Sequence, residues 1–321
     1  MKKLNWGLIG CGDISQKRVA PALRDLPECH LVAVNRARTD LAESFAREFG
    51  AKQWYADWQD LLNNKDIDAV YIATPVNLHA EQTIAAANAG KHILCEKPMA
   101  MNTQECDQMI AACKENNVKL SIAYYRHFYP VIERIKTILN SGQLGTVIMA
   151  TINAFEKFDR KPGEPRYWLL EKEKSGGGPM MDFGCHRIEV LVNLLGDVTD
   201  VKSITDTIHY DRSVEDTASA LIKFKAGMRG VLNVNHAIFE SQDTLDIWAT
   251  EGSIHVSTLN KGDLTMITSD GIATESHPPH KNVHLPHIQA FTHSVLNDTP
   301  VPVEGNEGKK ITAILDLIYN R

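Results

Sequence analysis

The sequence lacks the features that mark several classes of protein. No apolar run approaches the ~20 residues that a membrane-spanning helix needs. The formal net charge is -6, so there is no basic field to hold nucleic acid or an anionic membrane surface. The first residues lead into a strand pattern without the apolar core of a secretory signal peptide. We therefore expect a cytoplasmic protein with neither a nucleic-acid nor a membrane partner.

The sequence also lacks paired cysteines. Its six cysteines are scattered through apolar segments without CxxC spacing, which favours reduced, buried thiols. Four histidines (277, 280, 284 and 287) lie close together among prolines. They could bind zinc, but the proline-rich setting favours a mobile loop, so we predict no metal site.

The first third of the chain alternates between two patterns. Apolar strands are predicted at 4–9, 31–34, 69–72 and 93–95, with helical patterns at 41–49, 79–89 and 106–113. Strands that are apolar on both faces and alternate with helices form a parallel, doubly wound sheet. At 321 residues the chain suits two domains. We predict an α/β protein whose residues 1–122 form a dinucleotide-binding Rossmann domain.

After residue 122 the pattern changes. A helix near 131–139 is followed by an alternating strand at 146–155. Further strands are predicted at 201–208, 218–224, 228–234, 244–249, 253–256 and 264–268. Residues 123–321 therefore form an α+β domain on one large, mainly antiparallel sheet. We expect one face of this sheet to be broadly apolar and to pair copies of the chain into a homodimer or homotetramer.

A glycine-rich turn follows the first predicted strand and opens a helix. Gly10 allows the tight turn, and Gly12 allows close approach of the backbone to a pyrophosphate at the helix N-terminus. Ser15 replaces the third glycine of the usual fingerprint. We predict that the pyrophosphate lies over Gly10 to Ile14, Asp13 included. The alternative is a turn with no ligand.

The second strand ends in a segment that predicts the cofactor type. NAD sites usually place an acid here, to accept a hydrogen bond from the ribose 2′-hydroxyl. This chain has Asn35, Arg36 and Arg38 instead, and arginines can hold a 2′-phosphate. We predict a preference for NADP, with NAD as the alternative if both arginines are merely solvated and Asn35 contacts the ribose.

Two further stretches place ionisable groups in apolar or glycine-rich surroundings. Glu96-Lys97-Pro98 closes a buried strand, and Asp182 and His186 follow a triple glycine. Their four-residue spacing puts Asp182 and His186 on one helical face. Each also has a plainer interpretation: Lys97 as a surface lysine, Asp182 as a helix cap and His186 as a core residue.

Together these motifs resemble the glucose–fructose oxidoreductase, inositol dehydrogenase and rhizopine-catabolism family (Gfo/Idh/MocA). The matching pieces are 7–15, 73–79, 89–92, 96–98 and 176–186, so the resemblance spans nearly the whole chain. It implies a Rossmann domain followed by an α/β domain whose open sheet builds dimers or tetramers. It also implies oxidation or reduction of sugars, inositols and related polyols.

The resemblance also implies roles for individual residues. Lys97 would lie beside the nicotinamide and touch the reacting substrate oxygen, with Asp182 and His186 as the partner pair and His186 transferring the proton. Thr74, Pro75, Asn77 and His79 would line the cofactor, and Glu96 would contact it on the nicotinamide side. Arg126 would enter the active site. Tyr125 departs from the asparagine common in relatives. Apart from the resemblance, Trp168 could present its ring to a sugar or could belong to the core or rim of the second domain.

The chemistry of the residues agrees with these roles. Removal of hydride from a carbinol carbon requires the hydroxyl proton to leave, and a histidine can accept it near neutral pH. A partly desolvated lysine stabilises the developing alkoxide. We predict a nicotinamide-dependent oxidoreductase of a sugar, cyclitol or related polyol. The alternatives are a glycoside-cleaving enzyme of the same fold that oxidises its sugar transiently, and a non-catalytic dinucleotide sensor.

Overall fold

The computed structural model describes residues 2–321, which divide into two compact units. One contains the chain up to Tyr125 together with Asn282–Thr312, and the other contains Arg126–Lys281 with Ala313–Arg321. The domain boundary between residues 122 and 123 stays a prediction. The return of Asn282–Thr312 to the first unit is a feature that no sequence pattern indicated.

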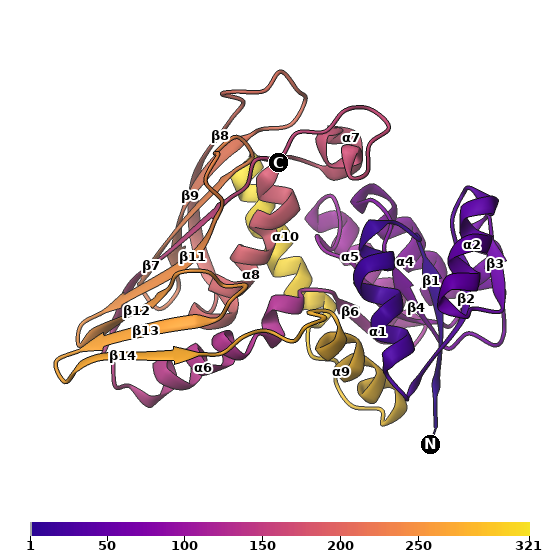
Figure 1. Ribbon diagram of the computed structural model, residues 1–321, viewed down its shortest axis with the longest axis horizontal. Coiled ribbons are helices and arrows are strands. Elements are labelled where there is room, and N and C mark those ends of the chain that lie inside the picture. The colour runs from indigo at the N-terminus through magenta and orange to yellow at the C-terminus, as the bar shows by residue number, and fades with distance from the viewer. Residues whose placement is uncertain (1) are drawn as a thin grey trace. The chain divides into compact units, whose positions relative to one another are not determined.

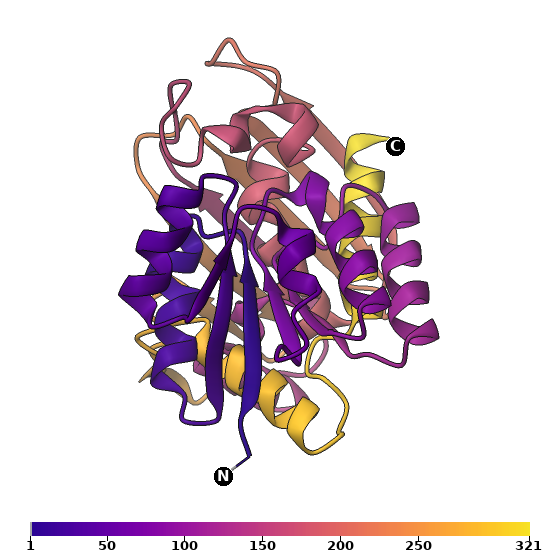
Figure 2. The same ribbon diagram turned by 90° about the vertical axis from the view of Figure 1, so that its right-hand side faces the viewer.

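The first unit is built on a parallel sheet of six described strands in the order β3-β2-β1-β4-β5-β6 (Figure 2). The strands are β1 (Leu4–Ile9), β2 (Cys29–Asn35), β3 (Gln53–Tyr55), β4 (Ala69–Ile72), β5 (His92–Cys95) and β6 (Leu120–Ile122). The central strands are buried on both faces, as their apolar sequences require. The predicted doubly wound Rossmann sheet is therefore confirmed.

Helices follow the strands of this unit. They are α1 (Ala20–Asp25), α2 (Thr39–Phe49), α3 (Trp58–Leu62), α4 (His79–Asn88), α5 (Thr103–Glu115) and α9 (Leu285–Leu296), with the start of α10 (Gly305–Tyr319). Helix α9 belongs to the returning segment and packs on β1 and α1. Its Phe291 lies 5.4 Å from the fully buried ring of Trp6, measured between ring centroids. The returning segment thus completes the core of the first unit.

The second unit contains a sheet of eight described strands in the order β14-β13-β12-β11-β7-β10-β9-β8 (Figure 1). The strands are β7 (Val147–Phe155), β8 (Val198–Asp206), β9 (Thr217–Phe224), β10 (Arg229–Asn235), β11 (Gln242–Ala249), β12 (Gly252–Val256), β13 (Asp263–Thr268) and β14 (Gly271–Ser276). All neighbouring pairs are antiparallel except β7 and β10. The predicted large, mainly antiparallel sheet is confirmed.

One face of this sheet packs against helices of its own unit. These are α6 (Pro130–Ser141), α8 (Cys185–Leu195) and the end of α10, with the short α7 (Lys172–Ser175) nearby (Figure 1). Strand β9 shows the alternation: Ala218, Ala220, Ile222 and Phe224 are buried, and the residues between them face outward. Burial of one row and exposure of the next fixes the register of the strand.

The opposite face is more polar than the sequence led us to expect. Ser219 donates to Asn233 at 2.8 Å, and Asn233 donates to Asn153 at 2.9 Å, so a chain of hydrogen bonds crosses β9, β10 and β7. Exposed apolar residues on the sheet strands, such as Leu221 and Ile267, are interspersed with these groups. Polar and apolar side chains therefore share the outward positions, and the pairing of copies through this face stays a prediction.

None of the helices among residues 2–321 is both long and apolar enough to cross a lipid bilayer. All six cysteines are buried as free thiols, as their apolar settings predict.

Candidate active site

The glycine-rich turn lies where β1 ends, at the carboxyl edge of the parallel sheet. Gly10 has φ +90°, and a Cβ there would lie 2.8 Å from the Ala73 backbone, so this position requires glycine. A Cβ on Gly12 would meet no atom within 4 Å. Open space beside Gly12, at the start of a helix, fits a dinucleotide pyrophosphate.

The residues after the glycines stabilise this turn. The Ser15 hydroxyl donates to the Gly10 carbonyl at 2.6 Å, so the residue that replaces the third glycine locks the turn. Ser15–Val19 form a π-helical turn that leads into α1. Asp13 pairs with Lys17 at 2.6 Å, and Ile14 is half-buried at the start of the helical turn. π-Helical turns inside helices occur often at functional sites.

The end of β2 and the residues after it carry the groups predicted to select the cofactor. The buried Asn35 amide donates to the carbonyls of Tyr55 and Ala56, at 3.1 and 3.0 Å, so these donors hold the sheet edge rather than a ribose. Arg36 is half-buried and Arg38 is exposed. The Arg38 guanidinium pairs with Asp40 at 2.7 Å.

The loops after β4 and β5 lie at the same carboxyl edge. Thr74 donates from its hydroxyl to Gln82 at 2.6 Å. The buried His79 ring joins the two loops, with its nitrogens 2.9 Å from the carbonyl oxygens of Thr74 and Pro98. Pro75 and Asn77 lie on the first loop, where α4 begins. These loops therefore lie at the carboxyl edge of the sheet, beside the switch point between β1 and β4, where doubly wound sheets bind ligands.

Glu96 is buried at the end of β5, and its carboxylate is surrounded by donors. It accepts from the Tyr71 hydroxyl at 2.7 Å, and the His284 Nε2 lies 3.3 Å away. Burial opposes its charge, but His284, Lys97 and Tyr71 outweigh burial and lower the pKa of Glu96 to about 2. The half-buried Lys97 follows immediately. A fixed negative charge thus lies beside the predicted catalytic lysine.

The histidines at 284 and 287 correct the prediction of a mobile loop. His284 is buried beside Glu96, and its ring lies 4.5 Å from that of Tyr125, measured between centroids. His287 is buried on α9, with its Nε2 2.9 Å from the Ser121 hydroxyl. The proline-rich sequence suggested disorder because periodicity cannot show that the chain returns to the first unit here.

In the second unit, close packing leaves no room for a side chain at two positions of the triple glycine. A Cβ on Gly178 would lie 2.0 Å from the Glu215 carbonyl oxygen, and one on Gly177 would lie 2.3 Å from the Tyr319 hydroxyl. The buried Glu215 carboxylate accepts from the backbone N–H groups of Gly178 and Met180, at 2.7 and 3.2 Å. It caps the π-helical turn Met180–Gly184 that leads into α8. Burial raises the pKa of Glu215.

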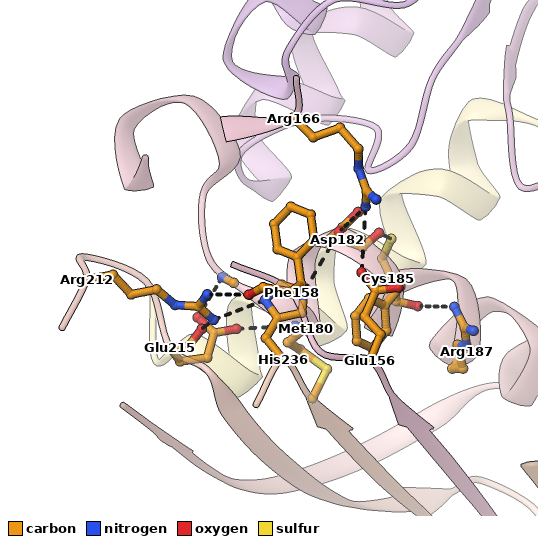
Figure 3. Close-up of polar contacts among 12 residues, drawn as sticks. Glu156, Phe158, Arg166, Met180, Asp182, Cys185, Arg187, Arg212, Glu215 and His236 are labelled. Atoms are coloured by element: carbon orange, nitrogen blue, oxygen red, sulfur yellow. Dashed lines mark hydrogen bonds and ion pairs between the residues drawn. The ribbon is translucent and has the colours of Figure 1, made fainter. Parts of the chain in front are cut away.

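Asp182 lies in this π-helical turn and is 8% exposed. Figure 3 shows Arg166 reaching it from the loop before α7, with Nη2 3.1 Å from Oδ2. The same nitrogen lies 3.8 Å from Glu156, at the end of β7. Burial and the Asp182 charge raise the pKa of Glu156. Arg166 therefore provides positive charge to two neighbouring carboxylates.

His186 and Arg187 lie on the first turn of α8 and are both buried. Arg187 donates to Asp243 at 2.7 Å, and Arg126 lies 3.1 Å from the second oxygen of the same carboxylate. Burial opposes the Asp243 charge, but the two arginines lower its pKa. The predicted substrate residue Arg126 is thus held in a buried ion pair. Trp168 is half-buried and packs against the cluster formed by Phe158, Leu169, Leu170 and Val214.

One group in the second unit has the residue types of a metal site. Ligand atoms of Glu156, Asp182 and His236 lie within 4.8 Å of one another. The Arg166 guanidinium already places a cation against both carboxylates. His236 offers its buried Nε2, whose protonation is determined by the contact at the other ring nitrogen. The contact of Arg212 with His236 Nδ1 keeps the proton on Nε2, and this disfavours a metal ion at Nε2.

Comparison with known proteins identifies the family. The family model of oxidoreductases with an NAD-binding Rossmann fold (Gfo/Idh/MocA) matches residues 4–124, and its C-terminal domain model matches 132–255. The chain belongs to this family. The predictions of the family, of a sugar or polyol oxidoreductase and of an NAD-binding domain are confirmed at this level.

Full-length relatives support the assignment. An oxidoreductase of Formosa agariphila is 30% identical over 98% of both chains. A D-xylose 1-dehydrogenase (NADP(+)) of Haloferax volcanii is 27% identical over 98% of this chain and 96% of the relative. A solved levoglucosan dehydrogenase, in complex with NADH and levoglucosan, is 26% identical with a TM-score of 0.90, covering 99% of this chain and 97% of that chain.

Proposed function

We propose that this protein is a dehydrogenase or reductase that transfers hydride between NAD(P) and a hydroxyl or carbonyl carbon of a sugar, cyclitol or related polyol. The observation that supports the proposal is that this family member has both a candidate cofactor site and a second site with a buried acid and histidine. Gly12 faces open space at the sheet edge, and Asp182 and His186 are buried at the start of one helix. A nucleotide sensor without catalysis has no need for the second site.

The cofactor would be held by the first unit. The turn Gly10–Ile14 would cradle the pyrophosphate, and the loops with Thr74, Pro75, Asn77 and Glu96 would line the remainder. His79 would hold those loops together. When bound, the nicotinamide supplies the hydride-accepting or hydride-donating centre.

The chain's own residues would handle the proton and the charge. His186 would accept the proton of the substrate hydroxyl. Lys97 would donate to the reacting oxygen and stabilise its developing negative charge. Asp182 would orient His186 or accept from a second substrate hydroxyl, and Tyr125, Arg126 and Trp168 would shape the substrate side.

We further propose that the enzyme prefers NADP and works as a homodimer or homotetramer in the cytoplasm. Arg36 and Arg38 offer positive charge at the end of β2, and the Haloferax relative is named for NADP. The outward face of the eight-stranded sheet would pair copies through its mixture of amide and apolar side chains. Light scattering at micromolar concentration tests this assembly, and a monomer would contradict it.

The function is tested with a panel of sugars, cyclitols and polyols, each with NAD and NADP, followed by absorbance of the reduced nicotinamide. His186→Ala should lower kcat by about 10²–10⁴-fold, and Lys97→Met should also act mainly on kcat. Both variants should keep cofactor affinity. His293→Ala and Lys114→Met, both at exposed positions of the first unit, are matched controls.

Two outcomes would contradict the proposal. Wild-type turnover in both His186→Ala and Lys97→Met would reduce these residues to packing roles. Glycoside cleavage without net reduction of free cofactor would favour the glycoside-cleaving alternative instead.

A further inference from the structure

His236 is a buried histidine that the proposed mechanism does not use. It follows the end of β10 and is fully buried, with ring centroids 4.9 Å from Phe158 and 5.2 Å from Phe183. Its backbone is fixed on both sides: its N–H donates to Asp216 at 2.8 Å, and its carbonyl accepts from Phe158 at 2.8 Å. The imidazole is therefore held in one position by packing and by the backbone.

The contact of His236 with Arg212 determines which ring nitrogen bears the proton. Arg212 Nη2 lies 3.0 Å from His236 Nδ1 and also donates to the Glu215 carbonyl at 3.0 Å (Figure 3). A guanidinium has donors only, so Nδ1 must accept. Burial lowers the pKa of His236 to about 3, although Asp182 opposes this shift. The ring is therefore neutral at working pH, and its proton resides on Nε2.

The Nε2–H tautomer favours a hydrogen bond from Nε2 and disfavours a metal ion there. A metal on Nε2 would need that nitrogen without its proton, but the Arg212 contact keeps the proton there. The Nε2–H is buried without a hydrogen-bond partner, and Asp182 Oδ2 lies 3.9 Å from it. A buried N–H without an acceptor is costly, so a nearby carboxylate is its natural partner.

We propose that His236 is a positioning residue that orients the Asp182 carboxylate for the reaction. Arg212 fixes the ring as an Nε2–H donor, and a shift of the carboxylate by less than about 1 Å would complete the hydrogen bond. Because its side chain is half-exposed, Arg166 would be the exchangeable partner of Asp182. The buried His236 would be the permanent partner. This inference rests on the proposed function for the role of Asp182.

The kinetic test is a double-mutant cycle between His236→Phe and Asp182→Asn. Phenylalanine keeps the ring packing and removes the donor. We expect His236→Phe to lower kcat about tenfold in the wild-type background and less than about twofold in Asp182→Asn. His236→Gln, whose amide can donate from a similar position, should recover most of the rate. His255→Phe, which removes an outer-face histidine 2.7 Å from Asp246, is the matched control.

Equal losses in both backgrounds, or failure of Gln to exceed Phe, would overturn the proposal and leave His236 a packing role. Wild-type turnover in Asp182→Asn would instead contradict the proposed role of Asp182. Thermal unfolding of each variant shows whether it folds.

A second measurement is independent of activity. Nitrogen-15 NMR of the histidine rings should show His236 as the Nε2–H tautomer throughout pH 5–8. The charged groups facing it are Asp182, Arg166, Arg212 and Asp216. The Nε2 resonance should move in Asp182→Asn and stay in place in Asp246→Asn. An Nδ1–H tautomer, or titration within that pH range, would overturn the inference even if the enzyme acts as proposed.

Discussion

The two glycine-rich turns of this protein look alike in sequence and differ in what surrounds them. Each leads into a π-helical turn, at Ser15–Val19 and at Met180–Gly184. A Cβ on Gly12 would enter open space, whereas one on Gly178 would collide with the Glu215 backbone. One glycine therefore leaves room for a ligand, and the other lets the chain pack against itself. Glycine content alone does not distinguish these uses.

Each unit also has a buried glutamate near its predicted site residues, and the pKa values of the two glutamates shift in opposite directions. Glu96 is surrounded by donors that lower its pKa to about 2. Glu215 has donors as well, but burial prevails and raises its pKa. Its neighbour Tyr319 donates to it at 2.6 Å. The first unit thus maintains a negative charge beside Lys97, whereas the second uses its glutamate as a structural cap.

The largest expected effect is on stability, from Gly178→Ala. The added methyl group would overlap the backbone oxygen of Glu215 at 2.0 Å, and backbone cannot move aside cheaply. We expect a loss of about 3 kcal/mol or more, since overpacking usually costs about 1–3. Urea unfolding measures this loss. A midpoint equal to that of wild type would show that the turn has room and would remove the contrast with Gly12.

Acid stability should separate the two glutamates. The folded-state pKa of Glu96 lies below its ordinary value of 4.5, so its contribution is present above about pH 4.5 and is lost as pH falls toward about 2. The full contribution is about 3 kcal/mol by linkage. Glu96→Gln should therefore flatten the fall in stability below pH 4.5, measured by urea midpoints.

Glu215→Gln should act in the opposite sense. A raised pKa gives a contribution that is present at low pH and lost as pH rises through the folded-state value. This variant should therefore lose stability relative to wild type as pH falls through that range. Identical pH slopes in the two variants would contradict the opposite directions of the two pKa shifts.

The fold was predictable from sequence where burial produces an apolar run or a regular alternation of apolar and polar residues. Strand β4 is apolar and buried throughout, β1 is so except at Asn5, and β9 alternates cleanly, so their types and positions could be assigned. Strand β3 has only three residues, and β14 is mostly exposed, so neither leaves an apolar signal. The return of α9 to the first unit is a tertiary event that local periodicity does not encode.

The site was predictable only in part, for a related reason. Glycines and the Glu96-Lys97 pair stand in motifs, whereas Arg166, Glu215 and His236 lie outside them, and His284 lies in a group of histidines for which no role was predicted. Each gains its role from a partner far along the chain, such as Glu96 for His284. The available signal is position: His236 follows directly on a buried strand, where a polar side chain must find a partner.

Gly12→Ala is the counterpart of the first prediction. No atom lies within 4 Å of the added methyl group, so stability should change by less than about 0.5 kcal/mol. Cofactor affinity should fall about tenfold, because the methyl group would occupy space needed by the pyrophosphate. Calorimetric titration with NAD and NADP measures this change. Unaltered affinity for both cofactors would show that the open space beside Gly12 is not the pyrophosphate site.

The smallest expected effects concern cofactor choice at the end of β2. Arg36→Ala should weaken NADP binding about 3–10-fold and leave NAD binding nearly unchanged, because only NADP has a 2′-phosphate to pair with. Arg38→Ala should do less, since Asp40 already shares its guanidinium at 2.7 Å. Asp40→Asn should then strengthen NADP binding by releasing Arg38. These shifts should shrink at high salt, more for the exposed Arg38 than for the half-buried Arg36, because salt screens exposed charges most. If all three variants bind NADP and NAD as wild type does, the arginines are solvated side chains, and cofactor preference at this sheet edge must come from elsewhere.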